Sequence, residues 1–275
     1  MKKTILSVLI LITLLLSSCT VYERGDELSV HFIDVGQADC ILVLLPGGKN
    51  MLIDAGNRSD GGAVAAYLSK YGVTTVDYLI GTHPHADHIG GLDTIIKEFD
   101  IGQIYMPRIS ADTKTFEDVL TAIKNKNLTV STAKAGVNVL DGDGVRIDIV
   151  APNSDNYTDT NDYSAVIKLT YGRRAFLFAG DAHKLSETEI TASLSADVLK
   201  VGHHGSSSST TDTFLRRVNP YYAVICVGEK NSYNHPHEST LNRLNEVCSE
   251  IYRTDLHGDI VFSTDGVSIS VHTEK

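Results

Sequence analysis

Gly81-Thr-His-Pro-His-Ala-Asp-His-Ile-Gly-Gly91 is the stretch of this 275-residue chain that decides its fold. Imidazole and carboxylate groups are the ligands that zinc and similar cations bind, and the stretch holds four within six residues: His83, His85, Asp87 and His88. Groups so close in sequence meet one or two ions only in a tight loop, of which Pro84 and the Gly90-Gly91 pair are typical. The stretch therefore predicts a metal site, with a solvent-facing polar loop as the alternative.

The segments before this stretch predict how the chain reaches it. Three short β-rich segments at 28–35, 40–45 and 51–53 suggest an antiparallel meander, and a helix is expected over 62–71. Residues 76–81 then form a buried strand that runs directly into the histidines. The ligands are thus expected at the carboxyl end of a strand, where α/β proteins build their sites.

Strands and helices alternate through the rest of the chain. Helices are expected over 89–99, 115–126, 184–194, 211–217 and 239–247. Strands are expected over 104–106, 128–131, 145–150, 164–171, 175–179, 197–201, 221–227, 250–253, 259–263 and 267–271. Two strand-rich halves with helices between them indicate two packed sheets covered by outer helices, in one domain over residues 28–275.

Residues 1–18 have the pattern of an export signal. Lys2 and Lys3 precede an apolar run that ends at Leu16 and is short for a spanning helix. The quartet Leu16-Ser-Ser-Cys19 resembles the lipobox of bacterial lipoproteins, whose cysteine is acylated. The resemblance implies a lipid anchor at Cys19, a short tether over 19–27 and a place on the outer face of the cytoplasmic membrane. A plain secreted protein is the alternative.

Charge and composition argue against some classes of function. The chain has 24 Lys and Arg against 34 Asp and Glu, a net charge of −10, whereas a protein that coats DNA needs many basic contacts to phosphate. Bound cations would still reverse the sign locally. Aromatic residues make up 7% of the chain and are too few near basic residues to predict a stacking platform. Three widely spaced cysteines besides Cys19 predict no disulfide framework: Cys40, Cys226 and Cys248.

A site with two ions needs ligands from other strand ends, and two segments fit. Residues 176–181 form an apolar strand that ends in Gly-Asp, so the two oxygens of Asp181 could bridge two cations. Residues 198–205 form another, which ends in the pair His203-His204, and either ring could turn inward.

These stretches resemble the metallo-β-lactamase-fold hydrolases, and within them the hydrolase domain of ComEC, the competence protein of DNA uptake. The matching stretches follow in the expected order: His31–Gln37, Leu52–Gly56, Thr82–Gly91, Asn161–Val166, Ala179–Asp181, Lys200–Ser206 and Asn234–His237. They span nearly the whole chain after the leader. The resemblance implies an α/β fold of four layers, an αββα sandwich, with a two-metal site between the sheets that holds zinc (Zn2+) or, in some members, manganese (Mn2+).

The resemblance also implies a role for each ligand. One ion would be bound by His83 and His85, the other by Asp87 and His88, and Asp181 would bridge them.

The paired histidines and one further acid complete the implied site. His203 is the preferred additional ligand of the second ion, with His204 held behind it, although the opposite assignment stays open. Asp54 would orient ligand histidines, unless it only forms the turn before Ala55-Gly56.

The sequence departs from the superfamily pattern at one ligand. No histidine occurs between His88 and His183, where a further ligand is usual. ComEC-like sequences have Asn-Asp-x-Ser there, and this chain has Asn161-Asp-Tyr-Ser164. One ion is therefore expected to bind weakly or to arrive with the substrate.

Two polar segments are candidates for substrate contact. Residues 205–210, with Ser206, offer hydroxyls and backbone N–H groups ahead of a helix, as a phosphate cradle or as a flexible loop. The resemblance places the cluster of Asn231, Tyr233, His235 and His237 at the rim of the site, where His235 would protonate a leaving group or grip a phosphate. A structural turn is the alternative for that cluster.

The leading hypothesis is a hydrolase in which metal-activated water, with Asp87 as proton acceptor, attacks DNA or a related phosphodiester. The rivals are a hydrolase of another extracellular ester, such as a phosphocholine ester or a lactone, and a binding module that holds metal without turnover. No long apolar span follows residue 19, so a part in DNA import would need a separate channel protein.

Overall fold

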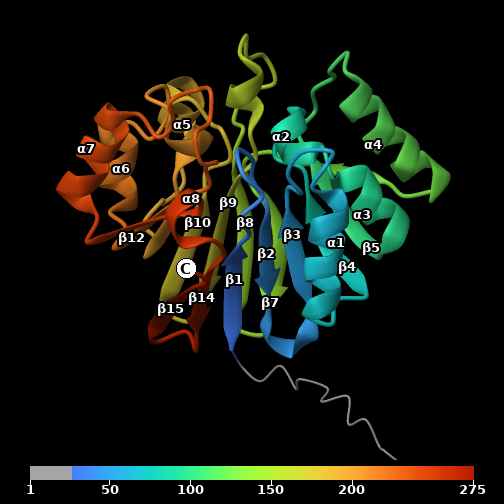
Figure 1. Ribbon diagram of the computed structural model, residues 1–275, viewed down its shortest axis with the longest axis horizontal. Helices are drawn as coiled ribbons and strands as arrows, with labels where there is room; N and C mark the ends of the chain where they lie inside the picture. The colour runs from blue at the N-terminus through green and yellow to red at the C-terminus, as the bar shows by residue number, and fades with distance from the viewer. Residues whose placement is uncertain (1–26) are drawn as a thin grey trace, which may run out of the picture.

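The computed structural model of the chain describes residues 27–275 (Figure 1). The predicted leader, the anchor at Cys19 and all but the last residue of the predicted tether lie outside the described residues. Two sheets pack face to face, and helices cover the outer face of each sheet. The four-layer αββα sandwich is thereby confirmed.

The first sheet has eight strands in the order β15-β14-β1-β2-β3-β4-β5-β6. Its strands are β1 (Leu28–Phe32), β2 (Ile41–Leu44), β3 (Asn50–Ile53), β4 (Thr75–Ile80), β5 (Asp100–Met106), β6 (Val130–Thr132), β14 (Ile260–Thr264) and β15 (Ile269–Thr273). The predicted meander is β1 to β3, in which each strand pairs antiparallel with the next. From β3 to β6 the pairing is parallel, so these strands end at one edge of the sandwich.

The second sheet has seven strands in the order β13-β12-β11-β10-β9-β8-β7. Its strands are β7 (Val137–Gly142), β8 (Val145–Ala151), β9 (Val166–Tyr171), β10 (Arg174–Phe178), β11 (Val198–Lys200), β12 (Tyr222–Ile225) and β13 (Glu250–Arg253). The four strands from β10 to β13 are parallel. Both sheets therefore contribute a set of parallel strands whose carboxyl ends carry the loops of the predicted site.

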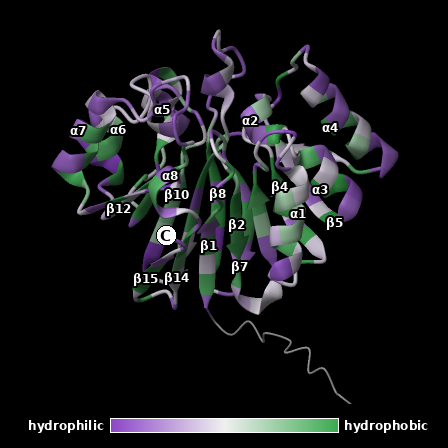
Figure 2. Ribbon diagram, viewed as in Figure 1, coloured by the Kyte–Doolittle hydropathy of each residue, from purple (hydrophilic) through white to green (hydrophobic). Residues whose placement is uncertain are grey.

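Helices cover the sheets through their apolar faces, as the green inner surfaces in Figure 2 show. On the first sheet lie α1 (Gly61–Lys70), α3 (Leu92–Glu98) and α4 (Lys114–Asn125), and on the second lie α5 (Lys184–Glu189), α6 (Asp212–Val218) and α7 (Glu238–Val247). Single turns of helix follow two strands: α2 (Ala86–Ile89) and α8 (Thr254–His257). In α4, for example, Val119, Ala122 and Ile123 are buried, which is the spacing of one helix face.

The inner faces of the two sheets form the central core. Phe32 from the first sheet meets Phe178 from the second at a ring-centroid distance of 6.2 Å, and Phe262 from the first meets Phe176 from the second at 6.4 Å. These aromatic pairs lock the two sheets together, because such pairs stabilise beyond the burial of their area. The relative position of the two sets of strand ends is thus set by the core.

The helix predicted over 184–194 is shorter in the structure and ends at Glu189. Ile190 and Leu194 are both buried against the second sheet, and their spacing of four residues is that of a helix face, but Ile190 has an extended backbone (φ −64°, ψ 117°) that ends the helix. The guanidinium of Arg217 donates to the carbonyl oxygens of Ile190 at 2.6 Å and Ala192 at 3.2 Å, and a helix that continued to residue 194 would have used the first of these. Tertiary hydrogen bonds therefore replaced the last turn.

Strand β7 was not predicted. It pairs with β8 across the two-residue turn Asp143-Gly144, in which both residues have positive φ. Asp-Gly is the preferred pair for this type of hairpin turn, so the turn was the available signal. The strand was missed because it lies at the edge of the sheet, where only Val139 of its six residues is buried, so the segment has no repeating apolar pattern.

The corner between α2 and α3 packs without space against the loop after β3. A Cβ added to Gly91 would lie 2.3 Å from the carbonyl oxygen of Ala55, and Gly91 N donates to Gly56 O at 3.2 Å. Ala55 N in turn donates to His88 O at 2.8 Å. The Gly90-Gly91 pair therefore allows the ligand loop to lie directly on the loop that carries Asp54.

We predict that Gly91→Ala destabilises the fold by about 2 kcal/mol, because the added methyl group must push two backbone segments apart. Urea unfolding followed by circular dichroism measures the effect. Gly62→Ala is the matched control, since its Cβ would meet nothing within 4 Å in helix α1, and it should be neutral or stabilising by up to about 1 kcal/mol. Equal midpoints for the two variants would show that the corner is not tightly packed.

Candidate metal centre

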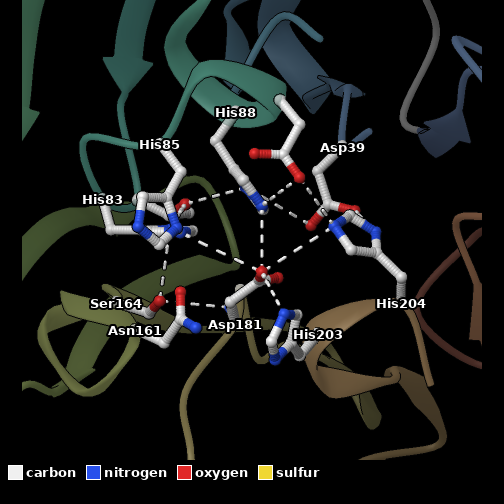
Figure 3. Close-up of polar contacts among 12 residues, drawn as sticks. Asp39, His83, His85, His88, Asn161, Ser164, Asp181, His203 and His204 are labelled. Carbon is white, nitrogen blue, oxygen red and sulfur yellow. Dashed lines mark hydrogen bonds and ion pairs between the residues drawn. The ribbon is translucent and has the colours of Figure 1, made fainter. Parts of the chain in front are cut away.

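The ligand loop begins where β4 ends. Gly81 N donates to Tyr105 O at 3.0 Å, and the chain then runs extended through His85 before α2 begins. Both His83 and His88 are fully buried, and Figure 3 shows their rings pointing inward toward Asp181. His85 lies at the side of the loop with its Nδ1 2.9 Å from Nε2 of His83. The loop therefore presents its histidines to one point, as the sequence predicted.

Asp54 lies behind this loop, at the end of β3. Its carboxylate accepts from Thr82 N at 2.8 Å, from Thr82 Oγ1 at 2.6 Å and from Nδ1 of His88 at 2.8 Å. With Nδ1 used as a donor, Nε2 of His88 is left facing the centre of the site. Asp54 is therefore in the position predicted for a residue that orients a ligand histidine.

Asp181 follows β10 of the second sheet and lies at the centre of the cluster. Its Oδ2 lies 3.2 Å from His88 Nε2, 3.9 Å from His83 Nε2, 3.6 Å from His203 Nε2 and 3.7 Å from His204 Nε2 (Figure 3). Burial by itself would raise the pKa of Asp181, but His88, His204 and His83 hold it well below its usual range. The carboxylate therefore remains charged inside the protein.

The same carboxylates act on His88. Burial lowers the pKa of His88, and the charges of Asp181 and Asp54 outweigh that effect and raise its pKa well above the usual value. A cluster that attracts a proton so strongly also attracts a cation, which competes with the proton for the same nitrogen.

The paired histidines after β11 take different positions. Both have positive φ in the turn Gly202–Gly205, which points their side chains apart. His204 is buried, donates from Nδ1 to Cys226 O at 2.9 Å, and directs Nε2 toward Asp87 Oδ2 at 3.3 Å. His203 is partly exposed, and its Nδ1 lies 2.8 Å from Nε2 of His183.

Three groups of three side chains have ligand atoms close enough to share an ion: His83, His88 and Asp181; Asp87, His88 and His204; and Asp39, Asp54 and His88. His204 therefore occupies the position that the sequence analysis preferred for His203, and His203 lies toward the pocket. The two rings are adjacent in sequence, so only the backbone conformation of the turn distinguishes them.

Asp39 and Lys200 belong to the cluster and were missed as site residues. Lys200 is the last residue of β11 and is fully buried, and its Nζ forms an ion pair with Asp39 and donates to Gly180 O at 3.1 Å. Asp39 also lies 3.4 Å from Nδ1 of His204. Both residues lie within or beside stretches quoted for the resemblance, and a lysine at the end of an apolar strand was the signal that could have found them.

The Asn161–Ser164 segment lies beside His83, in the turn Thr160–Tyr163 (η2) and the residue that follows it. Ser164 Oγ accepts from Asp181 N at 3.1 Å and lies 3.3 Å from Nδ1 of His83. Asn161 donates from Nδ2 to Nε2 of His183 at 3.2 Å, and its Oδ1 is buried without a hydrogen-bond partner in the described part of the chain. The segment that stands where a further histidine is usual thus contacts the site directly.

The phosphate cradle predicted at residues 205–210 is wrong, because the protein itself uses the backbone N–H groups there. The N–H of Ser207 donates to Nδ1 of His237 at 2.9 Å, and the N–H groups of Thr210 and Thr211 donate to the carboxylate of Glu187. Ser206 accepts at its carbonyl oxygen from Thr240 Oγ1 at 3.0 Å. Ser206 and His237 therefore brace this loop, and the carboxylate of Glu187 accepts from two of the N–H groups that would otherwise be free for a phosphate.

A pocket of about 330 Å3 opens onto the cluster. Its lining consists of Gln37, His85, Ala86, Asp87, Asn161, Asp181, His203, His204, Tyr233 and His235. The predicted rim residues Tyr233 and His235 are thus part of the pocket wall. A substrate that enters this pocket meets Asp87, Asp181 and His204 at its base.

The residues present fit a divalent cation. Four buried polar atoms at the centre of the site have no hydrogen-bond partner within residues 27–275: His88 Nε2, His204 Nε2, Asp181 Oδ1 and Asp39 Oδ1. Leaving such atoms unpaired costs about 1–3 kcal/mol each, so a native structure normally has a partner for them. Two of these atoms belong to imidazole rings whose other nitrogen already donates a hydrogen bond, as in metal-binding histidines.

Residues 33–229 match the family model of the Metallo-beta-lactamase superfamily, and the chain belongs to this superfamily. The ComE operon protein 3 of Bacillus subtilis (strain 168) is 29% identical over 258 residues, which cover 86% of this chain and 33% of that protein. Recombination protein 2 of Haemophilus influenzae is 30% identical over 237 residues, which cover 84% of this chain and 28% of that protein.

The Competence protein ComA of Neisseria gonorrhoeae is 29% identical, over 86% of this chain and 32% of that protein. All three relatives are ComEC-type competence proteins. The resemblance to the ComEC hydrolase domain is thereby confirmed. The chain spans about a third or less of the length of these relatives. In the region from residue 27 onward, none of the helices has the length and apolar character to cross a membrane.

Solved structures share the fold. The metallo-β-lactamase fold protein YhfI of Bacillus subtilis aligns with a TM-score of 0.56 at 13% identity, over 86% of this chain and all of that one. CmlA, a diiron β-hydroxylase from Streptomyces venezuelae, aligns with a TM-score of 0.54 at 12% identity, over 82% of this chain and 52% of its own.

We predict that His204→Ala and Asp181→Ala each lower the amount of bound zinc or manganese, because each removes a group that faces the unpaired atoms at the centre. His203→Ala is the matched control and should retain the metal, since its ring is partly exposed and lies outside all three groups. Elemental analysis of the purified full-length variants measures the stoichiometry. Loss of metal in His203→Ala with retention in His204→Ala would reverse the assignment.

We predict that Lys200→Met destabilises the protein by about 3–5 kcal/mol, because it leaves the buried carboxylate of Asp39 without its cation. The double variant Asp39→Asn/Lys200→Met should recover part of this loss, since both charges are then removed. Lys230→Met, at an exposed ion pair with Glu229, is the control and should leave the urea midpoint unchanged. A Lys200→Met midpoint equal to that of the control would mean that the buried pair contributes nothing.

Proposed function

We propose that this chain is a metal-dependent hydrolase that cleaves the phosphodiester bonds of DNA or a related polymer outside the cytoplasm. The observation that carries the proposal is the convergence at Asp181 of His83 and His88 from one sheet and His204 from the other, at the base of an open pocket. Membership of the superfamily and similarity to ComEC-type competence proteins support it.

We propose that the site takes two ions. One would be held by His83, Asp181 and, beside them, His85, and the other by Asp87, His88 and His204. Imidazole and carboxylate ligands suit zinc, and the carboxylates also suit manganese. The buried Oδ1 of Asn161 stands in for the missing histidine, and as a weaker ligand it supports the proposal that one ion binds loosely.

A bound divalent cation lowers the pKa of water toward 7 and polarises a phosphoryl oxygen, which is the chemistry that hydrolysis needs. The chain's own residues would position the reactants. Asp87 lies at the base of the pocket, where its carboxylate can accept a proton from the attacking water. Asp54 and the carbonyl oxygen of Cys226 keep the rings of His88 and His204 aimed at the centre.

We propose that His235 grips the phosphate rather than protonates the leaving group. Burial, together with the nearby rings of His203 and His204, lowers the pKa of His235 to about 4. At neutral pH its ring is therefore uncharged and is a hydrogen-bond donor or acceptor, not an acid ready to give up a proton. Its place in the pocket wall fits contact with a substrate oxygen.

The proposed place of action is the outer face of the membrane, with a lipid at Cys19 as the anchor. Strand β1 begins at Leu28, at the end of the sandwich opposite to α2 (Figure 1). A tether attached there would leave the pocket facing away from the membrane. If the chain takes part in DNA import, a separate channel protein would be its partner, as the much longer relatives suggest.

We predict that the full-length protein loaded with zinc or manganese hydrolyses single-stranded DNA and bis(p-nitrophenyl) phosphate. Asp181→Asn should lower kcat/KM by about two orders of magnitude or more, because it removes the charge at the centre of the site. Asp141→Asn, at an exposed ion pair on β7, is the matched control and should keep full activity.

The same assay separates the rival functions. Phosphocholine esters and lactones are tested beside the phosphodiesters, and preferred turnover of either would replace the proposal with that ester. Full metal loading without turnover of any of these substrates would indicate a binding module. Activity that survives in Asp181→Asn would mean that the cluster is not the active site.

A further inference from the structure

The exposed ring of Tyr233 at the pocket is a feature that the proposed hydrolysis does not explain. Tyr233 is 62% exposed, although it belongs to the pocket wall. Its ring stacks on His235 with the centroids 5.7 Å apart and the planes at 23°. His235 in turn stacks on His204 at 6.4 Å and 28°. Three nearly parallel rings therefore lead from the open edge of the pocket to the metal cluster.

The side chain of Asn231 holds the backbone that carries the outer two rings, those of Tyr233 and His235. Asn231 accepts at Oδ1 from Tyr233 N at 3.2 Å and from His235 N at 3.0 Å. Its Nδ2 donates to Gly228 O at 3.0 Å and to His235 O at 2.7 Å. Every hydrogen-bonding group of this side chain thus serves to shape the segment. The ring of Tyr233 is held ready in place, so little conformational entropy is lost when a ligand stacks on it.

The charge around the pocket makes such a ring useful. The ten residues that line the pocket in the described part of the chain include no Lys or Arg. The chain as a whole carries a net charge of −10. Binding of a polyanion therefore cannot depend on basic contacts along its backbone, and bound cations would supply positive charge only at the scissile phosphate.

We propose that Tyr233, backed by His235, is a subsite that stacks a nucleobase adjacent to the scissile phosphodiester, which makes single-stranded nucleic acid the substrate class. The inference rests on the proposed function. Stacking on an aromatic side chain stabilises every base, because every base has a flat π-face, and it needs no basic residue. A duplex keeps its bases stacked on each other, so only an unpaired base can lie on this ring.

The alternative ligand for an exposed aromatic ring is a quaternary ammonium group, as in a phosphocholine ester. Proteins recognise such cations with several aromatic faces arranged as a cage. The pocket wall contains one tyrosine, and the ring in contact with it, that of His235, lies nearly parallel to it on one side. The geometry therefore favours one stacked plane over an enclosed cation.

The sequence by itself did not predict a stacking platform. The reason was the scarcity of aromatic residues near basic ones. The platform here has no basic neighbours in the pocket wall, and one tyrosine and two histidines form it. Only the folded chain aligns these rings, because Asn231 and the turn after β11 set their planes.

The test compares two single-stranded oligomers of equal length, one with normal bases and one in which every base is absent, with the full-length metal-loaded protein. The wild type should cleave the base-bearing oligomer with a kcat/KM at least about 10-fold higher. Tyr233→Leu should bring this ratio close to one by raising KM for the base-bearing oligomer. Tyr233→Phe should keep the wild-type ratio, because it keeps the ring.

Tyr221→Leu is the matched control, since Tyr221 is 51% exposed but precedes β12 at the end of the strand remote from the pocket. It should keep the wild-type ratio. A ratio in Tyr233→Leu equal to that of the wild type would overturn the stacking subsite while leaving the phosphodiesterase intact. Cleavage of neither oligomer by the wild type would overturn the proposed function and the subsite with it. Selective loss of phosphocholine ester turnover in Tyr233→Leu would assign the ring to a cation instead.

Discussion

The charged carboxylate of Asp181 is held in the interior with almost no exposure, and the site is arranged around that constraint. Burial alone would favour the neutral acid, and only the nearby positive or polar groups keep it ionised. His88 and His83 from the first sheet, and His204 from the second, supply that compensation. These residues lie in the segments that follow β4 of the first sheet and β11 of the second, so the two sheets must be correctly placed against each other for the charge to be tolerated.

The braces behind the cluster show how the fold meets this requirement. Asp54 holds His88, the carbonyl oxygen of Cys226 holds His204, and Ser164 contacts both His83 and Asp181. These contacts orient the rings before any cation binds, which reduces the reorganisation that binding requires. The same arrangement leaves several buried atoms unpaired, so stability has been given up locally for the capacity to bind an ion.

The proposed substrate follows from how little the protein offers to a long polyanion. The chain has a net charge of −10, and the residues that line the pocket include no Lys or Arg. Such a surface is unsuited to binding a duplex along the phosphate backbone. A metal cluster that takes one phosphate and a ring that takes one base would be enough to hold a single strand at the point of cleavage. The loop at residues 205–210 adds no phosphate site, because Glu187 already uses its N–H groups.

The sequence alone was sufficient for the four-layer fold and for most members of the cluster, because hydrophobic period and ligand spacing are local properties of the chain. His83, His85, Asp87 and His88 lie within six residues, and Asp181 directly follows an apolar strand. The choice between His203 and His204 depended on two left-handed backbone conformations, and the ion pair of Asp39 with Lys200 joins residues 161 positions apart. The aligned rings of Tyr233, His235 and His204 likewise depend on contacts between distant segments. Tertiary structure alone decides such features, since the direction of a side chain in a turn is set by what packs against it.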